Sequence, residues 1–400
     1  MSSTPSTPSA ETILPASPAG VARAAELLAQ GKLVILPTET VYGIALNLLS
    51  PEARKAARHA KQRAQEANAA GGEPAHPAPR FSPWVIHVAQ PEDIFSWAPH
   101  VSALARRLIT KSLPGPVAFQ IRLDEAGIAA ARARLGDAAD ETLHNPEDGP
   151  ERYLTLRCPD FAITQSVLSG ADAPIAIIGA GTRQQPAMYD LQDLPASLLS
   201  ADSEITAALD GGPTRYRKPS TVVRIDGNAY SVVRAGVIDG RLFDRLADFT
   251  ILFVCSGNTC RSPMAAALAT QQIAAKLGVS ARELPLRHIV VQSAGVSASR
   301  GMRATLEARD AVKGLGGDLS THLSQTASID LLRRADVIYT MTDAHREEVL
   351  ELLPGAERKT VRVDPEGDVA DPIGAPLPVY ERVAARLAEV LQERLNEWPV

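Results

Sequence analysis

Short apolar runs alternate with longer amphipathic stretches along most of this chain, and that alternation restricts the folds it can adopt. In the first half, runs rich in β-branched residues occur at residues 32–37, 84–88, 117–123, 153–158, 173–179, 221–225 and 230–238. Stretches with apolar residues at every third or fourth position, the helical period, occur at residues 19–31, 51–63 and 101–112. Strands interleaved with helices predict an α/β or α+β fold for this half.

The pattern restarts after Ile238. A short polar segment leads into the apolar run ILFVC at 251–255, and further strands are expected at 288–295 and 335–341, with helices at 263–278 and 379–395. With 400 residues, 45% of them hydrophobic, the chain is long enough for two cores. We therefore expect a first domain at 13–246 with a twisted mixed sheet and a second at 247–400 with a doubly wound parallel sheet.

Two segments offer little apolar content to offset the entropy of ordering. Residues 1–12 are rich in serine, threonine and proline, and residues from about 64 to 80 are rich in alanine, glycine and proline. We expect the first to be a disordered tail and the second a disordered insertion in the first domain.

Composition excludes several classes of protein. Three cysteines are too few for a disulfide framework, and no apolar run is long enough to cross a membrane. The N-terminus lacks the basic flank and apolar segment of a signal peptide, so a cytoplasmic location is expected. The net charge of −5 argues against bulk electrostatic binding of nucleic acid and leaves a local basic patch open.

The segment VCSGNTCRSP, residues 254–263, joins the first strand of the second domain to its first helix. Ligand sites in such domains lie at the carboxyl ends of the strands, and a helix N-terminus attracts anions. We expect Ser262 to be the N-cap, Pro263 the first helical residue and Gly278 the end of the helix. Arg261 can bind two phosphate oxygens at once, and the field at the helix N-terminus favours the thiolate of Cys255. The segment therefore predicts a nucleophile in an anion-binding loop.

Two plainer interpretations compete with this one. Cys255 and Cys260 could ligate a metal, but the third cysteine, Cys158, is distant in sequence and no histidine is close. Either cysteine could instead be a small buried apolar residue. The combination of strand, cysteine, arginine and capped helix favours the nucleophile.

The stretch FVCSGNTCRSPMA resembles the signature of low-molecular-weight protein phosphatases, and the similarity continues through 291–295, 335–346 and 370–380. The resemblance implies that Cys255 attacks phosphorus, that Arg261 and the loop amides hold the phosphoryl oxygens, and that Asp371 protonates the leaving group and then activates water. It implies that the substrate is a phosphorylated protein and that the reaction needs neither a metal nor a cofactor. The implied phosphate-binding and loop-supporting residues are Ser256, Gly257, Asn258, Thr259, Cys260, Ser262, Ser293 and His322. Cys260 is also spaced to form a reversible disulfide with Cys255.

Residue 259 bears on the substrate. Members that act on phosphotyrosine usually carry a bulkier aliphatic residue there, whereas bacterial protein-arginine phosphatases carry threonine, and this chain has Thr259. Tyrosine-directed members also tend to place an aromatic residue after the Asp-Pro pair, where this chain has Ile373. Both features favour phosphoarginine over phosphotyrosine.

The first domain resembles the YrdC/Sua5 family of threonylcarbamoyl-AMP synthases. The resemblance is carried by LPTETVYGI at 36–44, AKQR at 60–63, LPGPVAF at 113–119, LTLRCPD at 154–160 and PSTVV at 219–223. It implies a basic cleft for ATP and magnesium, with a role in tRNA modification and a link to double-stranded RNA binding. The implied nucleotide and threonine cleft residues are Thr38, Thr40, Lys61, Arg63, Arg157, Ser220 and Arg234.

This chain departs from that family where the nucleotide should bind. The family's Ser-x-Asn motif aligns with Gly179 and Gly181, and Ala118 stands where threonine is usual. A site for a triphosphate and magnesium thereby loses polar groups. Three functions remain open. The first is a phosphatase whose first domain binds nucleotide or RNA, and the second is a bifunctional protein whose first domain is an active synthase. A third reading makes RNA or nucleotide binding the main role and the phosphatase accessory.

Overall fold

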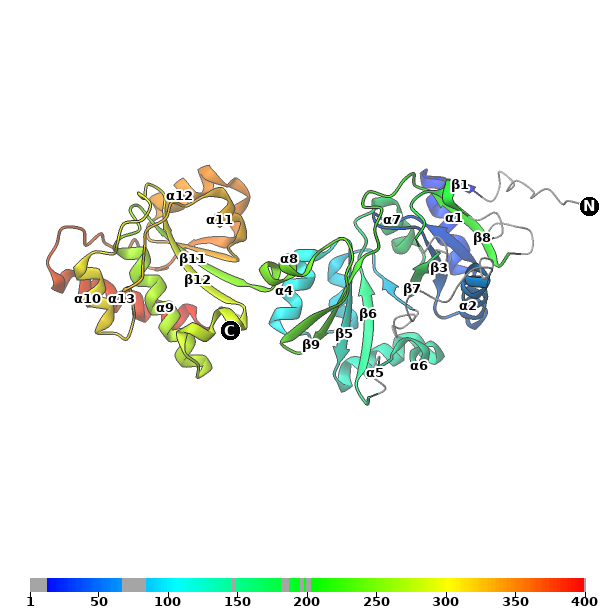
Figure 1. The fold of residues 1–400 in the computed structure, drawn as a ribbon, viewed down its shortest axis with the longest axis horizontal. Helices are drawn as coiled ribbons and strands as arrows, with labels where there is room; N and C mark the ends of the chain where they lie inside the picture. Colours follow the sequence, from blue (N-terminus) through cyan, green and yellow to red (C-terminus); the bar gives the residue numbers. More distant parts are fainter. Residues whose placement is uncertain are drawn as a thin grey trace, which may run out of the picture. The chain divides into compact units, whose positions relative to one another are not determined.

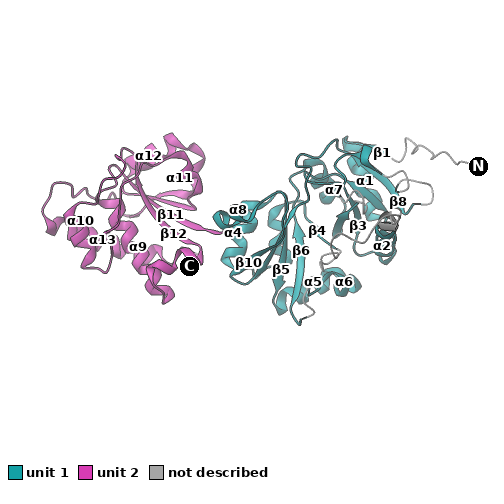
Figure 2. Cartoon of the chain, viewed as in Figure 1, with its two compact units in different colours: residues 1–246 teal, residues 247–400 magenta. Residues whose placement is uncertain are grey.

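The computed structural model describes residues 13–66, 84–145, 149–180, 187–194, 198 and 203–398, without the side chains of 63–66. The chain divides into two compact units, Met1–Leu246 and Ala247–Val400 (Figures 1 and 2). The expected tail at 1–12 lies outside the described residues, as do residues 67–80 of the expected insertion. Residues 64–66 are helical, because the helix that starts at Pro51 continues to Glu66.

In the described residues of the first unit, ten strands form one mixed sheet, and a mixed sheet was predicted. In sheet order the strands are β1 (Ile13–Pro15), β8 (Ile205–Asp210), β2 (Leu33–Leu36), β3 (Gly43–Asn47), β7 (Ile175–Gly179), β4 (Ile86–His87), β6 (Arg152–Arg157), β5 (Val117–Leu123), β9 (Thr221–Asp226) and β10 (Ala229–Arg234). Strand β3 is antiparallel to both β2 and β7, whereas β2 is parallel to β8. The apolar runs thus correspond to strands, and β1, β3 and β8 are strands that the pattern did not predict.

The helices of the first unit are α1 (Pro18–Ala29), α2 (Pro51–Glu66), α3 (Ile94–Trp97), α4 (Ala103–Ser112), α5 (Glu125–Leu135), α6 (Ala139–Thr142), α7 (Ala162–Gly170) and α8 (Gly240–Ala247). Helix α1 begins after Ser17, whose hydroxyl accepts the backbone N–H of Gly20, with proline at the start of the helix. Its apolar face packs with α7 against strands β2, β3, β7 and β8 in one core cluster.

The second unit is built on a parallel sheet of four strands, also as predicted. In sheet order the strands are β12 (Ile289–Gly295), β11 (Phe249–Cys255), β13 (Val337–Thr340) and β14 (Thr360–Arg362). Its helices are α9 (Arg261–Leu277), α10 (Leu306–Lys313), α11 (Ile329–Arg334), α12 (Asp343–Leu352) and α13 (Leu377–Arg394). None of the helices in the described residues combines the length and hydropathy that crossing a bilayer requires.

Helices cover both faces of this second sheet, which makes it doubly wound (Figure 1). Along β11 every residue is buried, and alternate side chains face opposite ways. Ile251, Phe253 and Cys255 pack with α9, α10 and α13, whereas Leu252 and Val254 pack with α11 and α12. The central strand therefore delivers Cys255, its last residue, to the carboxyl edge of the sheet on the α9 face.

The start of α9 differs from the expectation. The helix begins at Arg261 with Cys260 as its N-cap, and no side chain caps it. Ser262 is inside the helix and Pro263 follows it, so the predicted N-cap and first helical residue were wrong. The Ser262 hydroxyl instead contacts the loop that precedes the helix. Gly278 does end the helix, in the left-handed conformation with φ 65°.

Candidate active site

Residues 255–261 form a loop from the end of β11 to the start of α9, and the Cys255 sulfur lies inside it. The backbone N–H of Asn258 donates to Cys255 Sγ at 3.2 Å, and Ser262 Oγ lies 3.0 Å from the same sulfur. Cys255 is 3% exposed. The loop thus encloses the sulfur with a backbone N–H and a hydroxyl within hydrogen-bond distance.

Asn258 holds the loop in shape. Its side chain is fully buried and its φ of 54° is a left-handed conformation that non-glycine residues seldom adopt. Its amide Nδ2 donates to Ser262 Oγ and to Ser293 Oγ, each at 2.9 Å. A conformation that is costly by itself persists because these bonds fix it.

Two further groups complete this bracing. The backbone N–H of Gln325 donates to Asn258 Oδ1 at 2.9 Å, and His322 Nε2 lies 2.9 Å from the Asn258 carbonyl oxygen. Gln325 Nε2 also donates to the carbonyl oxygen of Ser293. The structure thus brings Asn258, Ser262, Ser293 and His322 together, and adds Gln325, whose backbone contact no side-chain pattern could have indicated.

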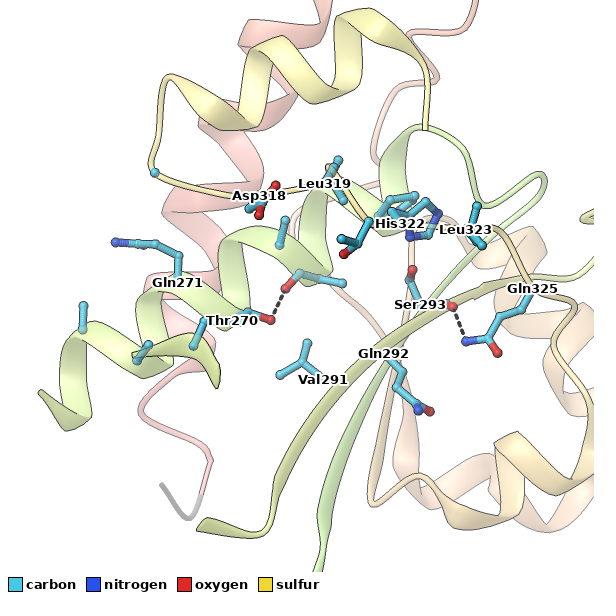
Figure 3. Close-up of a pocket in the computed structure, with 18 of the residues that line it drawn as sticks. Thr270, Gln271, Val291, Gln292, Ser293, Asp318, Leu319, His322, Leu323 and Gln325 are labelled. Carbon is cyan, nitrogen blue, oxygen red and sulfur yellow. Dashed lines mark hydrogen bonds between the residues drawn. The ribbon is translucent and has the colours of Figure 1, made fainter. Parts of the chain in front are cut away.

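A cavity of about 690 Å³ lies beside these bracing residues, between α9 and residues 316–325. Ser293, His322 and Gln325 line it, with Thr270 and Gln271 on the α9 side (Figure 3). Cys255 does not line this cavity. The cavity therefore borders the residues that brace the loop and does not reach the nucleophile.

Arg261, at the end of the loop, contacts the segment that contains Val369 and Asp371. Arg261 Nη2 lies 2.5 Å from Asp371 Oδ2, and its Nη1 donates to the carbonyl oxygen of Val369 at 3.1 Å. The arginine side chain is 7% exposed and the aspartate 41% exposed. A buried guanidinium, a group able to bind two oxygens of an anion, is thus paired with a solvent-accessible carboxyl.

The other loop residues have distinct surroundings. Ser256 and Gly257 are exposed, and Thr259 is half-buried, with its carbonyl oxygen accepting the backbone N–H of Thr305 at 3.1 Å. Cys260 is a free buried thiol that lies 3.5 Å from Tyr380 Oη. Burial raises the pKa of Tyr380 to about 12, so that its hydroxyl keeps its hydrogen beside this sulfur.

Sequence reasoning overlooked His345, on α12, which contacts the loop through Ser256. Its Nε2 lies 2.8 Å from Ser256 Oγ and its Nδ1 lies 2.7 Å from Thr342 Oγ1. Burial lowers the pKa of His345, and the charge of Arg261 lowers it further. A histidine in the segment 335–346 was visible in the sequence, but nothing there indicated that α12 would bring it to Ser256.

In the first unit, the structure gathers part of the predicted cleft. Arg157 Nη2 donates to Thr40 Oγ1 at 2.9 Å and to Glu39 Oε1 at 2.8 Å, and Thr38 Oγ1 lies 2.9 Å from Thr40 Oγ1. Glu39 Oε2 and Arg157 Nε are buried without a hydrogen-bond partner among the described residues. Buried polar atoms of this kind need a partner, which a bound ligand would supply.

The remaining cleft residues lie at two other places. Arg234 donates to the carbonyl oxygen and the hydroxyl of Ser220, and its pKa is lowered by burial and by the charge of Arg157. Lys61 Nζ donates to the carbonyl oxygen of Gly179 at 2.7 Å, and burial lowers its pKa. Arg63 is on α2 with its side chain outside the described residues, and Gly181 is outside them as well. Arg157 and Arg234 thus lie close enough to interact electrostatically, whereas Lys61 makes a separate contact with Gly179.

Each unit matches the model of a known protein family. The family model described as "Low molecular weight phosphotyrosine protein phosphatase" matches residues 250–397, and the model for Sua5, YciO and YrdC, described as "Telomere recombination", matches residues 26–70 and 77–236.

Individual relatives agree with the two family models. A protein-arginine-phosphatase of Geobacillus stearothermophilus is 37% identical over 154 residues, covering 37% of this chain and 95% of that protein. A putative threonylcarbamoyl-AMP synthase of Methanocaldococcus jannaschii is 26% identical over 208 residues, covering 52% of this chain and 81% of that protein. The solved low molecular weight protein tyrosine phosphatase from T. tengcongensis is 31% identical, with a TM-score of 0.34, over 38% of this chain and 100% of that one. The chain belongs to the low molecular weight phosphotyrosine protein phosphatase family through its second unit, and to the Sua5, YciO and YrdC family through its first.

Proposed function

We propose that the second unit is a phosphatase that removes phosphoryl groups from a protein through a cysteinyl-phosphate intermediate. The observation that carries the proposal is the position of Cys255, Arg261 and Asp371 around one loop at the end of β11. The names of the relatives that match this unit support it.

The reaction has two steps. In the first, Cys255 Sγ attacks phosphorus, the bond to the leaving group breaks, and Asp371 gives that group a proton. Arg261 and the loop N–H groups hold the phosphoryl oxygens as charge builds on them. In the second step, Asp371 takes a proton from water, the water oxygen attacks phosphorus, and the Cys255 thiolate leaves.

For the substrate, we favour phosphoarginine in a protein. Thr259 leaves more room at the loop than a larger aliphatic residue would, and Ile373, next to the Asp371–Pro372 pair, is 67% exposed and offers no ring for stacking on a tyrosine. Asp371 can also pair with a guanidinium leaving group.

Turnover of phosphoarginine and phosphotyrosine peptides by the same preparation tests this assignment. We expect higher kcat/KM with phosphoarginine, and Thr259→Ile should shift the preference toward phosphotyrosine. A clear preference of the wild type for phosphotyrosine would reject the arginine assignment while leaving the phosphatase itself in place.

For the first unit, we propose a nucleotide-binding cleft that includes Arg157 and Arg234. The buried guanidinium of Arg157 and the exposed one of Arg234 are close enough for the charge of Arg157 to lower the pKa of Arg234, so an anion between them is favoured. The unpartnered Arg157 Nε is a ready donor. Among the described residues no cluster of three or more histidine, cysteine or acidic side chains could hold a metal ion. These residues fit the phosphates of a nucleotide and not a protein-held magnesium ion.

Two measurements test that proposal. ATP binding by calorimetry should be weakened by Arg157→Lys, which keeps the charge and loses the planar fork. Formation of threonylcarbamoyl adenylate is then assayed with wild type and Lys61→Ala. If the wild type forms the adenylate and Lys61→Ala does not, the unit is a synthase and the binding-only reading is wrong.

A further inference from the structure

His345 connects α12 to residues 255–261, which we call the phosphate loop, through two short contacts. It is 4% exposed, with Nδ1 2.7 Å from Thr342 Oγ1 and Nε2 2.8 Å from Ser256 Oγ. Ser256 directly follows Cys255 and is exposed at the mouth of the loop. A buried imidazole thus contacts the hydroxyl of the residue that follows the nucleophile in the sequence.

The hydrogen bonds of Thr342 define which nitrogen of His345 carries the hydrogen. Thr342 Oγ1 already accepts the backbone N–H of His345 as the N-cap of α12. Among the described residues its own hydrogen has one acceptor within reach, His345 Nδ1. Because a hydroxyl has a single hydrogen to donate, Nδ1 accepts it and the ring hydrogen is on Nε2. His345 therefore donates to Ser256 Oγ.

The charges around His345 keep this neutral arrangement. Arg261, on α9, disfavours protonation, whereas Asp371 and Asp368, in the segment after β14, favour it, and burial outweighs both carboxylates so that the pKa of His345 is lowered. Asp368 is also engaged elsewhere, since its Oδ1 accepts the backbone N–H of Asp343 at 3.0 Å.

The consequence lies at Ser256. Its oxygen accepts from His345, and in the described part of the chain its hydroxyl contacts no other hydrogen-bonding group. A serine that accepts one bond directs its own hydrogen to a different acceptor. At the mouth of this loop that acceptor is an oxygen of the bound phosphoryl group.

We propose that His345 is a positioning residue of the phosphatase site, which turns the Ser256 hydroxyl so that it donates to the bound phosphoryl group. This inference rests on the proposed function of Cys255. In the opposite arrangement, with the hydrogen on Nδ1, Ser256 would donate to the imidazole and would have no hydrogen for the substrate.

A double-mutant cycle on kcat and KM with p-nitrophenyl phosphate tests the pair. Ser256→Ala and His345→Ala should each lower kcat about tenfold, the value of one hydrogen bond to a charged group, with KM changed less than about threefold. The double variant should be no slower than the slower single variant, because both remove the same interaction. His345→Gln, whose amide can still donate near the position of Nε2, should recover most of kcat.

His288→Ala is the matched control, since His288 directly precedes β12 and pairs with Asp248. Its kcat should equal that of the wild type. Thermal unfolding of each variant shows whether it is folded. If His345→Ala does not fold, the test is made with His345→Gln and with Ser256→Ala, which changes an exposed residue.

The outcomes are distinct. If the two single effects multiply to about a hundredfold in the double variant, or if His345→Gln is as slow as His345→Ala, the positioning role is wrong and the phosphatase stands. If wild type releases no phosphate, or Cys255→Ser releases as much as wild type, the proposed function fails, and the inference with it.

Discussion

Arg261 Nη2 and Asp371 Oδ2 lie 2.5 Å apart, so the residue that we assign as phosphate clamp is ion-paired with the residue that we assign as proton donor. In the proposed reaction, a phosphoryl group in the loop would compete with Asp371 for this guanidinium. Substrate binding would then free the carboxyl to act on the leaving group at the same time as it engages the arginine.

The first prediction concerns Asp371. Asp371→Asn removes the proton donor and should lower kcat by about 10²–10⁴-fold for a phosphate ester with a poor leaving group, and less for p-nitrophenyl phosphate, whose leaving group needs little protonation. Asp368→Asn, three residues earlier, is the control and should keep the activity of wild type. Equal losses with both esters would argue against proton donation by Asp371.

The second prediction separates the two properties of Asn258, its hydrogen bonds and its left-handed backbone. Asn258→Gly tolerates the φ of 54° but loses the bonds to Ser262, Ser293 and Gln325, and should destabilise the second unit by about 2–3 kcal/mol. Asn258→Ala loses the same bonds and adds backbone strain of about 1 kcal/mol. Urea unfolding measures the stability of both variants. If Asn258→Gly unfolds at the same urea concentration as wild type, the hydrogen bonds of Asn258 do not stabilise the second unit.

The third prediction concerns Gly295, at the end of β12. A Cβ there would lie 2.3 Å from the Ser256 carbonyl oxygen and 2.9 Å from the Asn258 nitrogen, both backbone atoms of the phosphate loop. Gly295→Ala should therefore displace the loop and abolish turnover while the second unit stays folded. Gly355→Ala, where a Cβ would meet no atom within 4 Å, is the control. Full activity of Gly295→Ala would mean that the loop shape is not needed for the reaction.

Several parts of this site and fold could be read from the sequence, for physical reasons. The strand at 251–255, the helix after it and the presence of a loop between them follow from local pattern, because the spacing of apolar residues is a property of neighbours in the sequence. The contacts of Asn258 with Ser293 and Gln325 join segments that are distant along the chain, and only the fold brings them together.

The errors in the sequence analysis share one cause. Strand β3 (Gly43–Asn47) begins in the family motif at 36–44, and its pairing with β2 and β7 makes it a strand. The segment at 240–247 looked polar and short, yet it is helix α8 with Phe243 fully buried. Ser262 resembled an N-cap, but its hydroxyl contacts Cys255 and Asn258. In each case tertiary contacts outweighed a local preference.

The fourth prediction is a pH dependence of the stability of the first unit. His87 is 5% exposed, and burial, followed by the charge of Arg157, lowers its pKa from 6.5 to about 3. Below about pH 6.5 the unfolded chain takes up a proton at His87 whereas the folded chain does not. The contribution of neutral His87 to the free energy of unfolding is therefore complete above pH 6.5 and is lost as the pH falls toward 3. Each pH unit in that window costs up to about 1.4 kcal/mol.

Urea unfolding at neutral pH and at about pH 5 measures this dependence. Between the two conditions, wild type should lose about 2 kcal/mol more than His87→Asn, which cannot titrate and can still donate to the Val85 carbonyl oxygen as Nδ1 does. The same loss in both proteins would show that His87 is protonated in the folded state.

The central claim is that Cys255 carries the phosphoryl group. Phosphate release by wild type and by Cys255→Ser, measured in parallel with rapid acid quench and mass spectrometry of the peptide containing residues 255–261, tests it most directly. We expect wild type to release phosphate and to show a phosphorylated Cys255 after the quench, and Cys255→Ser to release none above background. Phosphate release by Cys255→Ser at the wild-type rate, or a quenched wild-type peptide without phosphate during turnover, would contradict the account.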